Sequence, residues 1–309
     1  MNNLTGGRGV CEPKVPWPPA LLILTGILAL ASCASAPKTP AGSGGKFASL
    51  DPGAIVYLWA DIPGARPILD KSQFAGFDGK RTADILDRTS AAAAAIYPPE
   101  TGKRFMVAAR GRYPSFWAGM SFSFSASWKK RRSATGGRYW YSARENLSVF
   151  LNARGALVSD GDPFPRGDGP EVPPALEDMS AGAVFAGWIP DAAEPLKRFT
   201  AKLDLPIEIP ADQLIFALYP APEEGRYQAA LRLETPSATE AQALAAMISM
   251  LRLFLPPPDD LEAGSPAALA SALFANPPET GGAALLLKSA VLESGGIALL
   301  FNMFSIYSH

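Results

Sequence analysis

Short apolar runs recur along the chain after residue 50, separated by turns that contain proline and glycine. Two of these runs, at residues 54–61 and 182–189, are each closed by a proline and predict buried strands. The runs at 139–159 and 268–292 predict closing strand pairs, the second turning at a Pro-Pro-Glu-Thr-Gly segment. Two further pairs predict β-hairpins, namely 90–97 with 104–111 and 213–219 with 226–234.

Helical spacing of apolar residues occurs between the predicted strands. Residues 65–74 and 191–203 have this spacing, and residues 235–255 form the clearest case. We expect Thr235 or Ser237 to cap the last of these helices, because hydroxyl side chains accept hydrogen bonds from free backbone N–H groups there. Its core-facing side is predicted to consist of Leu244, Met247, Met250, Leu251 and Phe254.

The segment 116–128 fits two periods. Apolar residues alternate with serine from Phe122 to Trp128, which is the strand period. Apolar residues also recur at every fourth position from Phe116 to Trp128, which suits a helix. The internal similarity of the chain favours the helix.

Two parts of the chain resemble each other in sequence. The segment beginning at Ile96 aligns with the one beginning at Leu218, and four identities fall at a constant offset of 122 residues. An ordered series of matches at one offset indicates a tandem duplication. The matched pairs are Tyr97 with Tyr219, Arg110 with Arg232, Pro114 with Pro236, and Ser115 with Ser237.

The order of elements in each predicted unit is strand, helix, strand, strand, helix, strand, with an extra strand. This is the β-α-β-β-α-β order of ferredoxin-like folds. The sequence therefore predicts an α+β protein with mainly antiparallel sheets, built as a tandem duplication of a ferredoxin-like unit. The expected segments are a signal peptide (1–32), a flexible tether (33–50), a first basic unit (51–159), a linker (160–180) and a second acidic unit (181–309).

The N-terminal region has the features of an export signal. Residues 20–33 read ALLILTGILALASC, an apolar run that ends in small residues, and Arg8 and Lys14 lie upstream. The four residues Leu30 to Cys33 resemble the lipobox of bacterial lipoproteins. That resemblance implies cleavage before Cys33, acylation of Cys33 (palmitate or a similar chain) and anchoring to a membrane of the bacterial cell envelope, inner or outer.

The cysteine count agrees with this expectation. Cys11 would leave with the signal and Cys33 would carry the lipid, so the 277 residues from Cys33 onward would contain neither a disulfide nor a free thiol. The segment after Cys33 is rich in Ala, Ser, Pro and Gly and is expected to act as a flexible tether.

The sequence offers little catalytic equipment. Its single histidine is His309, so histidine-based triads and metal sites are excluded, and no phosphate-binding glycine loop occurs. Asp160, Asp162 and Asp168 lack the spacing of a calcium loop and are interpreted as a polar turn. We therefore expect no cofactor, no metal and, on balance, no enzymatic activity.

Charge is distributed unevenly. Residues 1–144 contain nineteen basic and eight acidic side chains (+11), and the rest contains nine and twenty-one (−12). The window 103–144 has ten basic residues and no acidic one. In one interpretation, the basic and acidic units dock together and their charges compensate, or the charges are simply solvated. In the other, a basic site binds an anionic partner, such as lipid or envelope glycan. Nucleic acid is not expected. The candidate site residues are Lys129, Lys130, Arg131, Arg132, Arg138, Tyr139, Trp140, Tyr141 and Arg144.

Together these features predict a membrane-anchored envelope lipoprotein that binds or scaffolds another envelope component. Two alternatives stay open on the sequence. One is a hydrolase of envelope polymers that uses a pair of carboxylates, which would meet only in the folded chain. The other is a carrier of a small apolar ligand held in a cavity between the two units.

Overall fold

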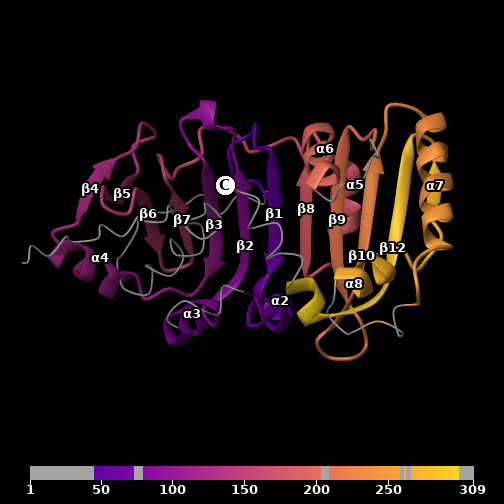
Figure 1. The fold of residues 1–309 in the computed structure, drawn as a ribbon. Coiled ribbons are helices and arrows are strands. Elements are labelled where there is room, and N and C mark those ends of the chain that lie inside the picture. The colour runs from indigo at the N-terminus through magenta and orange to yellow at the C-terminus, as the bar shows by residue number, and fades with distance from the viewer. Residues whose placement is uncertain (1–44, 73–78, 203–208, 258–260, 262–265, 299–309) are drawn as a thin grey trace, which may run out of the picture.

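The computed structural model describes residues 45–72, 79–202, 209–257, 261 and 266–298. Its centre is a twelve-stranded sheet in the order β11-β12-β10-β9-β8-β1-β2-β3-β7-β6-β5-β4 (Figure 1). Neighbouring strands pair antiparallel throughout. The strands are β1 (Val56–Asp61), β2 (Thr89–Ile96), β3 (Phe105–Gly111), β4 (Trp128–Arg132), β5 (Arg138–Ser142), β6 (Leu147–Asn152), β7 (Gly155–Ser159), β8 (Phe185–Ile189), β9 (Gln213–Pro220), β10 (Arg226–Glu234), β11 (Glu279–Gly281) and β12 (Ala284–Glu293).

Helices fill most of the connections between strands. A short 3₁₀ turn, η2 (Pro99–Thr101), links β2 to β3. No helix among the described residues is long and apolar enough to cross a bilayer. The helices are α2 (Ile62–Leu69), α3 (Gly79–Leu86), α4 (Ser115–Phe124), α5 (Pro174–Ser180), α6 (Ala193–Lys202), α7 (Ala238–Arg252) and α8 (Pro266–Leu273).

One face of the sheet, which we call the helical face, carries α2, α3, α4, α6, α7 and α8. Side chains that alternate along the strands supply its core, such as Phe105, Val107 and Ala109 of β3, which pack with Phe122 of α4. Leu233 of β10 lies in the corresponding cluster with residues of α7. Because strand side chains point to the two faces in turn, a central strand such as β3 contributes to both cores: Phe105 and Val107 face α4, and Met106 faces the opposite side.

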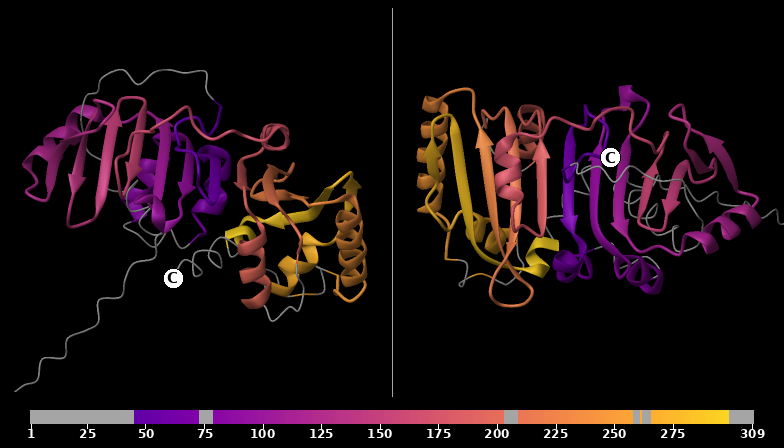
Figure 2. Two further views of the ribbon diagram at one scale, coloured as in Figure 1. Left: turned by 90° about the horizontal axis from the view of Figure 1, so that it is seen from above. Right: turned by 180° about the vertical axis from the view of Figure 1, so that it is seen from behind.

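The opposite face, which we call the strap face, is covered by α5 and by segments without regular structure. Phe47 and Leu50 from the start of the described chain and Phe164 from the predicted linker pack there. Phe47 meets Tyr57 of β1 edge-on, and the Tyr57 ring stacks on Trp188 of β8 with centroids 5.1 Å apart. Phe164 packs against Phe150 of β6, with a centroid distance of 4.8 Å. The views from above and from behind (Figure 2) show the twist of the sheet and helix α5 on this second face.

The two predicted units share one sheet. β1 and β8 pair antiparallel over four residues, from Tyr57 opposite Trp188 to Ala60 opposite Phe185. Each of these strands is the innermost of its half, so the hydrogen-bonded ladder continues from one half to the other. The sequence analysis did not predict this junction, because strand pairing between distant segments leaves no local signal.

Several predicted elements are confirmed. The hairpins β2–β3 and β9–β10 form where expected, and the first Pro-Pro-Glu-Thr-Gly segment makes the turn between β2 and β3. Residues 115–124 form helix α4, as the internal similarity favoured. The alternation from Phe122 to Trp128 does not form a strand, because Phe122 and Phe124 belong to α4 and only Trp128 belongs to β4. Ser237 caps α7: its hydroxyl accepts a hydrogen bond from Glu240 N and donates one to Glu240 Oε2.

Other predicted elements are wrong in part. Residues 266–273 form α8, where a strand was expected, and alanine-rich composition explains the preference for a helix. Residues 139–159 form three strands, β5, β6 and β7, where a pair was expected. The expected core side of α7 is right for Leu244 and Met247, which belong to the core, and wrong for Met250, Leu251 and Phe254, which are exposed. Ala241 and Ile248 are the buried positions that were not predicted.

The mixed helix-and-strand class with a large antiparallel sheet is confirmed, but the ferredoxin-like arrangement is not. In a split β-α-β unit the two strands joined by a helix run parallel, with another strand between them. Here β1 and β2 are joined through α2 and α3, yet they are direct antiparallel neighbours from Val56 opposite Ile96 to Asp61 opposite Ala91. β1, β2 and β3 therefore form a meander, after which the chain crosses through α4 to the edge strand β4 and returns through β5 and β6 to β7, which pairs with β3.

Candidate functional site

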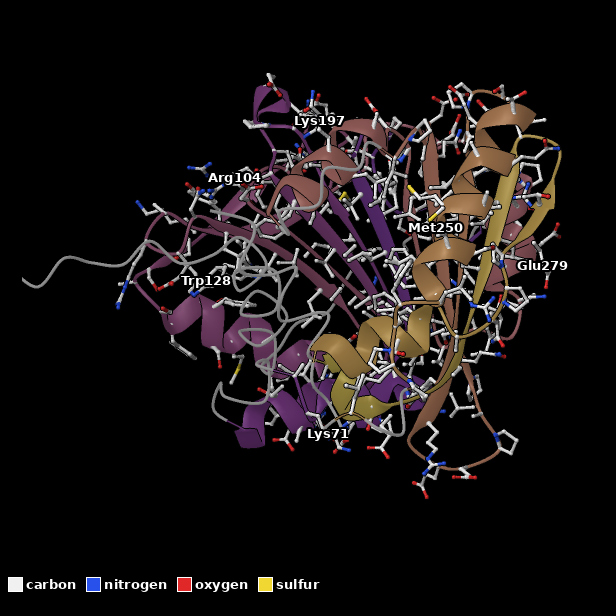
Figure 3. The ribbon with its side chains drawn as sticks, turned by 45° about the vertical axis from the view of Figure 1, so that its right-hand side comes forward. Lys71, Arg104, Trp128, Lys197, Met250 and Glu279 are labelled. Atoms are coloured by element: carbon white, nitrogen blue, oxygen red, sulfur yellow. The ribbon has the colours of Figure 1, made fainter. Side chains whose placement is uncertain are left out.

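The predicted basic residues converge on a hairpin at one end of the sheet. β4 is the edge strand and pairs only with β5, in a regular register from Trp128 opposite Ser142 to Arg132 opposite Arg138. Figure 3 shows Trp128 beside α4 at this end of the molecule. The hairpin brings together eight of the nine predicted site residues, namely Lys129, Lys130, Arg131, Arg132, Arg138, Tyr139, Trp140 and Tyr141.

The strand period divides these residues between the two faces of the sheet. Trp128 and Trp140 pack against Phe122 of α4, with ring centroids 4.6 and 5.5 Å from that phenylalanine. The alternate positions Lys130 and Arg132 therefore belong to the helical face. Lys130 confirms this, since its ammonium lies 4.9 Å from the centre of the Trp140 ring.

The other two cations of β4 lie on the strap face. Lys129 is opposite Tyr141, and the Arg131 guanidinium lies 3.7 Å from the centre of the Tyr141 ring. Tyr139 on this face is buried and meets Phe164 edge-on, at a centroid distance of 6.5 Å. Tyr139 is thus a core residue, and the sequence analysis was wrong to expect it to face a ligand.

Arg144 lies apart from the hairpin ladder, in the turn between β5 and β6. It is exposed, and its nearest acidic neighbour is the adjacent Glu145, with 3.4 Å between Nε and Oε1. Among the described residues no carboxylate lies within ion-pair distance of any of the four cations of β4. Within the part of the chain that the structure describes, the positive charge of this strand is therefore not neutralised by ion pairs.

An exposed apolar stripe on α4 accompanies the cations of the helical face. Phe116, Trp117 and Phe124 are 61%, 63% and 83% exposed, and Met120 is also exposed. Ala118, Gly119 and Phe122 turn inward. The four-residue spacing of this stripe was visible in the sequence, where it predicted the helix but not an exposed surface. The missed signal was the second apolar series of α4, at positions 118 and 122, which forms the core.

In the predicted acidic cluster, the carboxylates of Asp160 and Asp162 bind groups of the protein itself. The Asp160 carboxylate accepts from the backbone N–H of Arg104 and pairs with its Nε at 2.9 Å. Asp162 accepts from the Ser133 hydroxyl at 2.6 Å and from Phe164 N at 3.1 Å. No group of three or more potential metal ligands occurs in the described part of the chain. The polar-turn interpretation accounts for both contacts.

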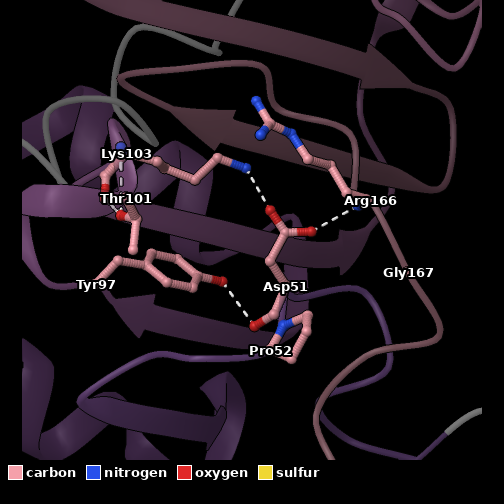
Figure 4. Close-up of a pocket in the computed structure, with 7 residues that line it drawn as sticks. All are labelled: Asp51, Pro52, Tyr97, Thr101, Lys103, Arg166 and Gly167. Atoms are coloured by element: carbon pink, nitrogen blue, oxygen red, sulfur yellow. Dashed lines mark hydrogen bonds and ion pairs between the residues drawn. The ribbon is translucent and has the colours of Figure 1, made fainter.

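A small cavity of about 230 Å³ lies beside the start of the described chain (Figure 4). Lys103 Nζ and Asp51 Oδ2 form an ion pair of 2.7 Å there, with side chains 7% and 12% exposed. Arg166 N donates to the other oxygen of Asp51, and the Tyr97 hydroxyl donates to its backbone carbonyl. Burial, helped by the charge of Asp51, raises the pKa of the Tyr97 hydroxyl.

This cavity and a second one of about 210 Å³ bear on the two open alternatives. The second is lined by Met179, Tyr219, Gln228 and neighbours in the acidic half. Neither cavity is lined by a pair of carboxylates, the arrangement expected of a glycosidase. Neither lies between the two halves, and both are smaller than typical small-molecule sites of about 300–1,000 Å³.

Comparison with known proteins establishes the fold alone. No protein-family model matches the sequence, and no curated protein matches it either. Three crystal structures of a protein called TP0453 resemble this chain. Crystal form III superposes with a TM-score of 0.56 at 17% identity, over 84% of this chain and 99% of TP0453. Crystal form IV superposes with a TM-score of 0.57 at 19% identity, over 84% of this chain and 97% of TP0453. Crystal form I superposes with a TM-score of 0.56 at 18% identity, over 85% of this chain and 98% of TP0453.

Cys33 and the rest of the predicted signal and lipobox lie outside the described residues. The described chain starts at Gly45, and Phe47 and Leu50 are already buried on the strap face. A lipid attached at Cys33 would thus be joined to the body through a short segment that enters the strap face.

Proposed function

We propose that this protein is a lipid-anchored lipoprotein of the bacterial cell envelope and that its body docks on an anionic membrane surface. The observation that carries the proposal is the apolar stripe of α4 beside the cations of the helical face. Phe116, Trp117 and Phe124 are exposed on α4, and Lys130 and Arg132 lie on the same face of the adjacent β4. The anchor itself is inferred from the lipobox-like sequence that ends at Cys33.

The chemistry of this face suits a bilayer surface better than open water. Aromatic residues favour the interface between lipid headgroups and acyl chains, and a contiguous apolar patch on a soluble surface marks an interaction site. Basic residues near an anionic leaflet contribute about 1 kcal/mol each. Lys130 and Arg132, with Arg138 opposite Arg132 on β5, place three cations on the face that the stripe shares.

The proposed anchor and the proposed face have different tasks. Diacylated cysteine with an acylated amine would hold the chain in the membrane without help, since each buried methylene contributes about 0.8 kcal/mol. The α4 face is therefore proposed to set the orientation of the body relative to the bilayer. An oriented body would present its remaining surfaces, including the sheet edge, to another envelope component.

Vesicle sedimentation tests the proposal. The probe is the full chain with Cys33→Ser, so that acylation cannot mask the result, mixed with phosphatidylglycerol-containing vesicles. Lys130→Ser with Arg132→Ser should weaken binding about thirtyfold, because two cations near the surface are lost. Lys129→Ser with Arg131→Ser is the matched control, with the same change of net charge on the other face, and should weaken binding less than about threefold.

Two results would contradict the proposed docking face. Equal losses in the two double variants would show that net charge alone governs adsorption. Binding that persists unchanged in high salt after both substitutions would show that the cations are not involved. Binding to acidic envelope glycan but not to vesicles would assign the face to the other partner class that the sequence allows.

We also propose that the body is a tandem duplication arranged about the β1–β8 junction. Outward from it, β1, β2 and β3 on one side correspond to β8, β9 and β10 on the other, and α4 and α7 each follow the third strand. The Tyr97 hydroxyl donates to Asp51 O, and that of Tyr219 donates to Met179 O. Each tyrosine thus holds the segment leading into the first strand of its own half. Failure of the two halves to superpose in crystallographic coordinates would contradict the duplication.

A further inference from the structure

The two edges of the twelve-stranded sheet are treated differently. At one edge β12 is covered by β11, which is only three residues long. Beyond β11, the Asn276 side-chain amide donates to the carbonyls of Lys288 and Ser289, at 3.0 Å each. Figure 3 shows Glu279 of β11 at the opposite end of the molecule from Trp128. This edge therefore ends in a strand of only three residues, which offers a short ladder.

The other edge, β4, is open over its five residues. Its pairing with β5 has no bulge, and no described strand pairs with its outer side. Ser133 N donates to Gly137 O at 2.8 Å, which makes residues 133 and 137 a hydrogen-bonded pair. Because such pairs alternate in antiparallel ladders, the backbone groups of Lys130 and Arg132 point away from β5. These outward N–H and C=O groups are a template for another strand.

The charges of β4 select which strand can be added. Lysines on an edge strand protect it from pairing with neutral or basic strands, including a second copy of itself. Protection of the edge against such pairing would not require cations in fixed positions. Here, however, Lys130 lies over the Trp140 ring and Arg131 over the Tyr141 ring. One cation of this pair projects on each face of the strand. An incoming strand that carries carboxylates would meet opposite charge across the ladder.

We infer that the outer edge of β4 binds an extended acidic segment of a partner protein, which adds a thirteenth strand to the sheet. Backbone hydrogen bonds to Lys130 and Arg132 would supply affinity, and the flanking cations would supply the choice of an acidic sequence. This inference goes beyond membrane docking, because it uses the backbone edge of the hairpin in addition to the side chains of one face.

Peptide binding to the full-length chain in mild detergent tests the inference. The probe is a fluorescent peptide of alternating Glu and Thr, and the reference is the same peptide with one central Thr replaced by Pro, which keeps the charge but removes a ladder donor. The acidic peptide should bind at low salt, and the proline-containing peptide should bind about tenfold more weakly. A matched peptide of alternating Lys and Thr should not bind.

A pair of variants in the chain separates the ladder from the charge. Lys130→Ser removes one cation and keeps the outward N–H, whereas Lys130→Pro removes both. The proline variant should bind the acidic peptide about tenfold more weakly than the serine variant. Thermal unfolding checks that both variants fold, and the peptide comparison remains decisive if the proline variant does not.

Two results would overturn the inference. Equal binding of the two acidic peptides would reduce the site to charge attraction without strand addition. No binding of the acidic peptide at low salt would remove the site. Either result leaves vesicle docking intact, since that depends on side chains of α4 and the helical face, whereas Lys130→Pro and Lys130→Ser should lose vesicle binding equally.

Discussion

The buried ion pair between Asp51 and Lys103 shows how single residues fix the start of the described chain against the sheet. Lys103 directly follows the Pro-Pro-Glu-Thr-Gly turn, and Asp51 belongs to the segment leading into β1. Arg166 N, from the predicted linker, donates a hydrogen bond to the same carboxylate. Three segments far apart in the sequence are tied at one carboxylate. The repeated Pro-Pro-Glu-Thr-Gly motif of this half therefore has a structural use.

We predict that Lys103→Met destabilises the chain by about 3 kcal/mol, because removal of one partner leaves the buried Asp51 charge uncompensated. Lys288→Met is the matched control: it breaks the exposed pair with Glu279 and should cost less than about 1 kcal/mol. Urea unfolding followed by circular dichroism measures both. A loss for Lys103→Met no larger than that for the control would contradict the structural importance of the pair.

Helix α4 shows what an element's sequence reveals and what it conceals. Two apolar series lie on this helix, and periodicity predicted the helix itself. It did not reveal which series faces the sheet, because Phe116 and Phe124 are as apolar as Phe122. The end of α7 repeats the problem, with Met250 and Phe254 exposed. Only the position of the helix over the sheet decides the core side, and that position depends on long-range strand pairing.

We predict that truncation of two phenylalanines of α4, two residues apart, has very different effects on the free energy of unfolding. Phe122→Ala should lower the free energy of unfolding by about 3 kcal/mol, because it empties a site between Trp128 and Trp140. Phe124→Ala should change it by less than about 0.5 kcal/mol, since that ring is exposed. Chemical denaturation measures both free energies. Similar effects for the two variants would contradict the assigned faces of α4.

At the scale of the whole molecule, the sequence predicted the strands and hairpins near the middle of each half but not the single sheet. The strand runs, the first turn and the Ser237 cap are local signals, and they were confirmed. The β1–β8 junction and the edge position of β4 arise from pairing between distant segments. The candidate site was therefore predicted as a list of residues, whereas its division between two faces required the sheet.

The uneven distribution of charge along the sequence becomes a separation of charge between the two ends of the sheet. The basic half ends in the five-residue edge strand β4, and the acidic half ends in the three-residue edge strand β11. The sequence left open whether the two halves neutralise each other. They meet through β1 and β8, strands whose facing residues are Tyr57, Ala60, Phe185 and Trp188, and the cations of β4 lie at the far end. The cations of β4 therefore lie at the end of the sheet that is farthest from the acidic half.

The contact of α4 with the bilayer is the central claim, and site-directed spin labelling measures it directly. Cys11 and Cys33 are the only cysteines, so a chain with both replaced by serine accepts one label at a chosen site. On addition of anionic vesicles, a label at Phe124→Cys should lose contact with a water-soluble relaxation agent and gain contact with oxygen. A label at Asp178→Cys, exposed on α5 of the strap face, should change little. Unchanged accessibility at Phe124→Cys in vesicle-bound protein, or equal changes at both sites, would contradict docking through α4.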